Sequence, residues 1–178
     1  MRQLSLALAV VLLLVFLLAA CSGGDPSAQT AVGGASESHA APEACTVVTA
    51  ADVEEVLGAA AKVRGSDQLQ TIAAASLCSY EAADGARNLV SVMVRMGPPG
   101  LDAETNLKQY VDGMKVNMGD AYRIDPVDGL SGPAVWNPGM MQLTVFKGRA
   151  LAIVTMLGEE AEPLTAAQAL GEKALSKL

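Results

Sequence analysis

Three kinds of hydrophobic pattern follow one another along this chain of 178 residues. A continuous apolar run extends from Leu6 to Leu18, residues 22–44 contain almost no large apolar side chain, and from Cys45 onward apolar residues recur at helix or strand spacing. The first pattern is typical of an export signal. The second lacks the apolar surface needed to fold, and the third predicts a packed domain.

Alternating apolar and polar residues predict two β-hairpins in the domain. In residues 88–96, NLVSVMVRM, valines alternate with polar or flexible side chains, and an Asp-Gly turn separates this run from residues 78–82. Such a pattern is typical of a hairpin with one buried face. A second pair of β-rich runs, at 141–146 and 150–157, predicts another hairpin, and a short strand is expected at 121–124.

Helical spacing marks three other segments. Thr49 is placed to cap a helix that Gly58 ends, and Asp102 is placed to cap a second helix. A third helix is predicted near the carboxyl end, with Thr165 and Gln168 as its capping pair. The apolar stripe of the second helix consists of Leu107, Tyr110, Val111, Met114 and Met118. The order of elements predicts an α+β domain, an antiparallel sheet built from hairpins with about three helices packed on it.

The apolar run near the start ends at a cysteine, in the tetrad Leu18-Ala19-Ala20-Cys21. This tetrad resembles the bacterial lipobox, in which a lipid is joined to the cysteine thiol and the chain is cut just before it. The resemblance implies that residues 1–20 are a lipoprotein signal peptide. It also implies that Cys21 carries acyl chains such as palmitate, which anchor the protein without spanning the membrane. A plain secretory signal with an incidental cysteine is the alternative.

Residues 21–44 are expected to form the lipidated cysteine and a flexible tether, because they are rich in Gly, Ala, Ser and Pro. The only histidine, His39, lies in this tether and is expected to be an ordinary solvated residue. The single domain is then predicted at 45–178. The formal net charge is −7. Nucleic-acid binding requires a cluster of basic residues, and this sequence contains no such cluster.

Cys45 and Cys78 are the two cysteines of the predicted domain. In an exported protein this even pair predicts a disulfide, because the compartment outside the inner membrane is oxidising. Two free buried thiols are the alternative. Neither cysteine belongs to a C-x-x-C pair, so a redox catalyst is not predicted.

The domain shows no recognisable catalytic arrangement. A nucleophilic triad needs a histidine, and residues 45–178 contain none. The stretch around Ser131, GLSGP, lacks the spacing of a nucleophile elbow and predicts a turn. Carboxylate pairs such as Asp125 with Asp128 lie in loop-like stretches and are expected to be solvated. We therefore predict no enzyme activity, no catalytic residue, no cofactor and no resident metal.

Two apolar features remain as candidates for function. Trp136, Met140 and Met141 lie in VWNPGMM, a candidate contact loop for a partner, although packing of Trp136 in the core beside the second hairpin is the favoured interpretation. Methionine pairs are expected to fill the core, and thioether ligation of copper(I) is the alternative. The pairs are Met93 with Met96, Met114 with Met118, and Met140 with Met141.

Several stretches of the domain resemble a group of small bacterial envelope lipoproteins that carry a domain of unknown function. These stretches are CTVVTAADVEEVLG, CSYEAADG, VDGLSGPAVW, LTVFKGRALAIV and ALGEKALSKL. The resemblance covers nearly the whole of residues 45–178. It implies a compact α+β fold similar to that of the photosystem PsbP proteins and the yeast Mog1 protein, and a place in the cell envelope.

The sequence thus predicts a membrane-anchored envelope lipoprotein with a non-catalytic binding or structural role. Its partner is expected to be an envelope protein, glycan or lipid. An envelope carrier of copper(I) or of a small hydrophobic ligand is the alternative. The expected location is the outer side of the cytoplasmic membrane or the outer membrane, held there by Cys21.

Overall fold

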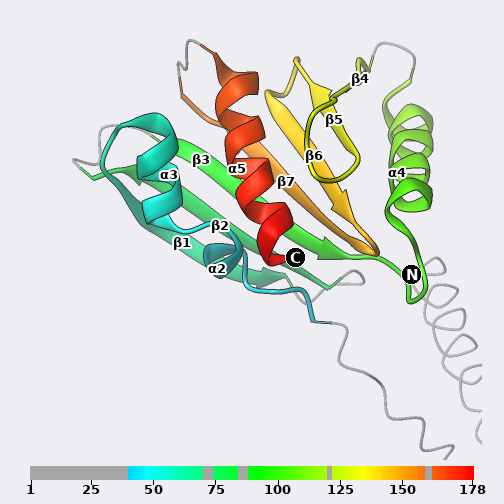
Figure 1. Ribbon diagram of the computed structural model, residues 1–178, viewed down its shortest axis with the longest axis horizontal. Helices are drawn as coiled ribbons and strands as arrows, with labels where there is room; N and C mark the ends of the chain where they lie inside the picture. The colour runs from blue at the N-terminus through cyan, green and yellow to red at the C-terminus, as the bar shows by residue number, and fades with distance from the viewer. Residues whose placement is uncertain (1–39, 70–73, 84–87, 120–121, 159–161) are drawn as a thin grey trace, which may run out of the picture. The chain divides into compact units, whose positions relative to one another are not determined.

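The computed structural model describes residues 40–69, 74–83, 88–119, 122–158 and 162–178. The predicted signal peptide, Cys21, His39 and most of the tether lie outside these residues. In the described chain, seven strands form one antiparallel sheet in the order β1-β2-β3-β7-β6-β5-β4, accompanied by four helices (Figure 1). The predicted α+β class is therefore confirmed. None of the described helices combines the length and apolar character that crossing a bilayer requires.

The two predicted hairpins are confirmed, and they pair with each other through β3 and β7. The strands are β1 Ala61–Leu69, β2 Ala75–Ala82, β3 Asn88–Met96, β4 Asp125–Pro126, β5 Ala134–Asn137, β6 Gln142–Lys147 and β7 Ala150–Met156. The helices are α2 Ala44–Val47, α3 Ala50–Leu57, α4 Ala103–Met118 and α5 Pro163–Lys177. Three of these elements, α2, β1 and β5, were not predicted. Residues 122–124, where a strand was expected, are not a strand, and pairing begins instead at Asp125.

Helices cover the sheet on both faces (Figure 1). On one face, α2, α3 and α5 pack on fully buried side chains such as Val92 of β3 and Val154 of β7. On the other face, α4 packs over β5, β6 and β7, where Phe146 and Leu151 contact its apolar stripe. Because successive residues of a strand point to opposite faces, the alternation in β3 assigns its valines to the first face.

The helix starts follow the predicted caps in two cases out of three. The Thr49 hydroxyl accepts a hydrogen bond from the Asp52 amide at the start of α3, and Asp102 accepts one from Thr105 at the start of α4. The prediction for α5 is wrong, because this helix begins at Pro163 and Thr165 lies inside it. Proline suits the first helical position, since its fixed φ is helical and the missing N–H has no partner there.

The first described residues are held against β2. A disulfide joins Cys45 of α2 to Cys78 of β2, as predicted. The amide of Ala44 donates to the hydroxyl of Ser76 at 2.9 Å, and Ala41 is also buried. Packing of the domain therefore begins a few residues before Cys45, the boundary expected from composition.

Candidate functional site

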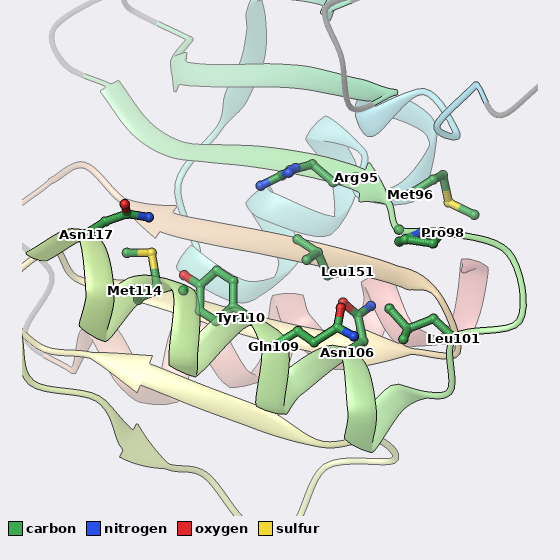
Figure 2. A pocket seen from close by; sticks show the side chains of 12 residues that line it. Arg95, Met96, Pro98, Leu101, Asn106, Gln109, Tyr110, Met114, Asn117 and Leu151 are labelled. Atoms are coloured by element: carbon green, nitrogen blue, oxygen red, sulfur yellow. The ribbon is translucent and has the colours of Figure 1, made fainter.

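A pocket of about 300 Å³ lies between α4 and the adjacent ends of β3 and β7 (Figure 2). It forms because α4 packs over β5 to β7, so that one edge of the helix faces β3. The lining residues of α4 recur at intervals of three or four, which places them on one side of the helix. They are Asn106, Gln109, Tyr110, Gly113, Met114 and Asn117, and the sheet and the loop after β3 add Arg95, Met96, Gly97, Pro98, Leu101 and Leu151.

Two glycines shape this pocket in opposite ways. Gly97 follows β3, and its amide donates to the carbonyl of Arg149 at 2.7 Å. A Cβ on Gly97 would lie 3.1 Å from that carbonyl oxygen and 3.2 Å from a methyl group of Leu101. The absence of a side chain at Gly97 therefore permits the backbone after β3 to approach the backbone of Arg149. A Cβ on Gly113 would meet nothing within 4 Å, so the missing side chain on α4 leaves open space.

One end of the pocket carries a charge and a phenol hydroxyl, although Met114 also lies there (Figure 2). Figure 2 shows the Arg95 side chain extending towards the half of the pocket that contains Tyr110 and Asn117. The Tyr110 hydroxyl accepts a hydrogen bond from the buried Thr144 hydroxyl at 3.2 Å. Burial raises the pKa of Tyr110 above its usual value, and the positive charge of Arg95 opposes this only in part. The phenol therefore stays neutral at physiological pH and can donate a hydrogen bond.

The other end of the pocket combines apolar and amide side chains. Pro98 and Leu101 lie there together with Asn106 and Gln109 (Figure 2). Asn106 is only 6% exposed, and its amide donates to the carbonyl of Gly148 at 3.3 Å. This amide therefore ties α4 to the β6–β7 turn.

The predicted contact loop is divided between the core and the surface. Trp136 lies in β5, opposite Leu143 of β6, and only 7% of it is exposed. Met140 and Met141 lie in the following turn and are 42% and 38% exposed. Of the two alternatives, Trp136 thus follows the core one, and only the methionines remain as surface contacts.

The methionine pairs are dispersed over the fold. Met114 and Met96 line the pocket, but Figure 2 shows them at opposite ends of it. Met118 belongs to the predicted apolar stripe of α4 yet is 47% exposed, so the stripe ends before it. No three His, Cys, Asp or Glu side chains gather into a metal-binding group among the described residues.

The polar candidates outside the pocket are occupied by local contacts. Ser131 is exposed, and its backbone amide donates to Glu172 at 3.0 Å, which lowers the pKa of that carboxyl group. Asp125 pairs with Arg123 at 2.9 Å. These contacts stabilise loops and assemble no catalytic group.

The pocket was missed at the level of sequence. Arg95 was one of the polar residues that alternate with buried valines, and its position in β3 gave no reason to single it out. The signal that comes nearest is the row of amides and glycine beside the apolar stripe of α4, at Asn106, Gly113 and Asn117. This row marks a helix edge that is neither apolar nor charged.

Comparisons with models of protein families, with curated proteins and with solved structures each found no match for this chain. The likeness to envelope lipoproteins and to the PsbP and Mog1 folds therefore depends on the sequence motifs alone.

Proposed function

We propose that this protein is a lipid-anchored lipoprotein of the bacterial cell envelope that binds a small ligand in the pocket beside α4 without transforming it. Two groups of observations support the location. The tetrad ending at Cys21 resembles a lipobox, and the Cys45–Cys78 disulfide suits an oxidising compartment. Two or more acyl chains at Cys21 would hold the protein to the membrane stably.

The composition of the pocket carries the proposal of binding. Its volume of about 300 Å³ is at the lower limit of ordinary ligand sites, about 300–1,000 Å³. The described lining combines apolar side chains with a small number of hydrogen-bonding groups, which is the usual composition of a ligand site. It contains no Ser, Cys, His, Lys or carboxylate side chain that could act as a nucleophile or base.

The anchor is tested by expressing the full chain in a bacterium. We expect the protein in the membrane fraction, with an intact mass that starts at Cys21 and includes acyl chains. The Cys21→Ala variant should lose the added mass. A wild-type chain of unmodified mass in the soluble fraction would contradict the proposed location.

The pocket is tested by NMR on isotope-labelled protein with a mixed library of small polar, apolar and amphiphilic compounds. We expect ligands to shift the amide resonances of α4 and of the end of β3. Gly113→Leu should abolish these shifts, because its side chain would extend into the open space of the pocket. Gly113→Ala is the matched control and should retain binding. Shifts that persist in Gly113→Leu, or that occur elsewhere, would refute a binding role for this pocket.

A further inference from the structure

Arg95 differs from most other cationic side chains in the described chain. Lys62, Lys108, Arg123, Lys173 and Lys177 each form an ion pair with a carboxylate. Arg95 is partly buried, and none of the ion pairs among the described residues includes it. Lys115, Lys147 and Arg149 also lack an ion pair among the described residues, but Arg95 is the member of this group that lines the pocket.

The surroundings of Arg95 are neutral on each side that the structure describes. Its partners on the neighbouring strands are Ala75 of β2 and Leu151 of β7, which carry no charge. Across the pocket, α4 contributes the amide of Asn117 and the neutral hydroxyl of Tyr110. A partly buried guanidinium without a counter-charge is poorly solvated, and an anion beside it would offset that loss.

The size and polarity of the pocket restrict the rest of the ligand. A volume of about 300 Å³ holds about ten water-sized groups, since one water occupies about 30 Å³ in the liquid. The guanidinium lies towards one end, and Pro98 and Leu101 lie at the other, beside the amides of Asn106 and Gln109 (Figure 2). A ligand that matches Arg95 and these apolar side chains has a charged head and a largely apolar body of medium length.

Building on the proposed binding role, the geometry points to a small anionic amphiphile as the ligand. Its oxyanion head, a carboxylate or a phosphate, contacts Arg95, with Tyr110 and Asn117 as hydrogen-bond donors. Its apolar body extends towards Leu101. Guanidinium groups suit such heads because they can donate two parallel hydrogen bonds to either oxyanion.

Three probes with the same apolar chain test this inference: octanoate, octyl phosphate and octan-1-ol. Each is titrated into the full lipidated chain in lipid nanodiscs, and the Gly113→Leu variant in the same nanodiscs corrects for partition into lipid. We expect at least one anionic probe to bind about tenfold or more tightly than the alcohol, because hydrogen bonds to charged groups are the stronger ones. The stronger of the two anions identifies the head group. Its affinity should fall with added salt.

Two substitutions test the role of Arg95. Arg95→Gln should reduce the affinity of the anion to that of octan-1-ol, whereas Arg95→Lys should retain part of the difference. Lys115→Gln is the matched control, because it removes the same charge from an exposed position of α4 outside the lining and should change nothing. If Arg95→Gln does not fold, the comparison of the three probes on the wild-type chain still decides whether the pocket prefers an anionic head group.

The outcomes separate the inference from the proposed function. If octan-1-ol binds as tightly as both anions, or if Arg95→Gln leaves the anion affinity unchanged, the inferred anionic ligand is wrong while the pocket remains a binding site. If no probe binds the wild-type chain more tightly than it binds Gly113→Leu, the inference also fails. The NMR experiment with the broader compound library then decides whether the pocket binds any ligand.

Discussion

The hydroxyl of Tyr80 on β2 donates a hydrogen bond to the backbone carbonyl of Val48, which lies between α2 and α3. Both residues are fully buried. Together with the disulfide between Cys45 and Cys78, this bond fastens the two short helices to the sheet. It also satisfies a carbonyl group that would otherwise be buried without a partner.

Removal of the Tyr80 hydroxyl should destabilise the domain. Tyr80→Phe leaves the Val48 carbonyl buried and unpaired, so we expect a loss of about 1–3 kcal/mol in the free energy of unfolding. Urea denaturation of both proteins measures the difference. Tyr122→Phe is the matched control, because the Tyr122 hydroxyl contacts the Met140 sulfur and the Tyr110 hydroxyl and no buried carbonyl group among the described residues. Equal stability of Tyr80→Phe and wild type would contradict the structural role of the bond.

The same tyrosine should make stability depend on alkaline pH. Burial, aided by the negative charge of Asp52, raises the pKa of Tyr80 to about 12. In the unfolded chain the pKa of tyrosine is about 10. The contribution of the neutral phenol to the free energy of unfolding is therefore complete below about pH 10 and is lost as the pH rises towards 12. We expect the free energy of unfolding to fall in this window by about 1.4 kcal/mol per pH unit. Denaturation of Tyr80→Phe should show a shallower decline, and parallel curves would oppose the assignment.

Local signals in the sequence were sufficient for much of the fold. The cap at Thr49 and the alternating valines of β3 depend on neighbouring residues only, and both predictions are confirmed. β1 was missed because it is an edge strand, where exposed side chains such as Lys62 and Arg64 hide the alternation. β5 was missed because its four residues directly precede a Pro-Gly turn.

The candidate site was not predictable in the same way. Arg95, the α4 side chains and Leu151 come from three separate parts of the chain, and the sheet order brings them together. The periodicity of α4 predicts an apolar face but not which strands that face covers. The position of the helix over β6, with its edge towards β3, is a consequence of tertiary packing.

Reduction of the Cys45–Cys78 disulfide should destabilise the whole domain. The bond closes a loop with a sequence separation of 33, and the chain-entropy model gives about 3–4 kcal/mol for such a loop. We expect the double variant Cys45→Ala/Cys78→Ala to lose most of this stability in urea denaturation. Hydrogen exchange at α2 should increase more than at α4, because α2 carries one of the cysteines. Equal protection in α2 before and after reduction would argue against this function of the disulfide.

Asp52 should make stability depend on acidic pH. Partial burial would raise its pKa, but hydrogen bonds from Lys177 and Thr49 outweigh this effect and hold the pKa well below its usual value. The contribution is therefore present above about pH 4 and is lost as the pH falls further. Asp52→Asn should cost about 1–2 kcal/mol at neutral pH, because it removes the charge from the hydrogen bonds with Thr49 and Lys177, and less in acid.

Glu55→Gln is the matched control for Asp52→Asn. Glu55 lies on the same helix and pairs with Lys173, but its side chain is 69% exposed, against 14% for Asp52. An exposed ion pair contributes little, so we expect a change below about 1 kcal/mol. Urea denaturation at several pH values compares the two variants. Similar losses in both would mean that burial of Asp52 is unimportant.

Two helix glycines should respond to alanine with opposite signs. At Gly113 of α4 a Cβ meets nothing within 4 Å, so Gly113→Ala should stabilise the domain by up to about 1 kcal/mol through helix propensity alone. At Gly171 of α5 a Cβ would lie 2.7 Å from a methyl group of Leu143 and 3.0 Å from one of Val145. Gly171 therefore permits the close contact of α5 with β6.

Gly171→Ala should accordingly destabilise the domain despite its better helix propensity. Overpacking of this kind typically costs about 1–3 kcal/mol, which exceeds the gain of about 1 kcal/mol from alanine. Urea denaturation of both alanine variants measures the two signs in one experiment. If Gly171→Ala were as stabilising as Gly113→Ala, the contact between α5 and β6 would have to be looser than described. Restoration of stability by adding Leu143→Ala, relative to Leu143→Ala alone, would show that the clash is with that side chain.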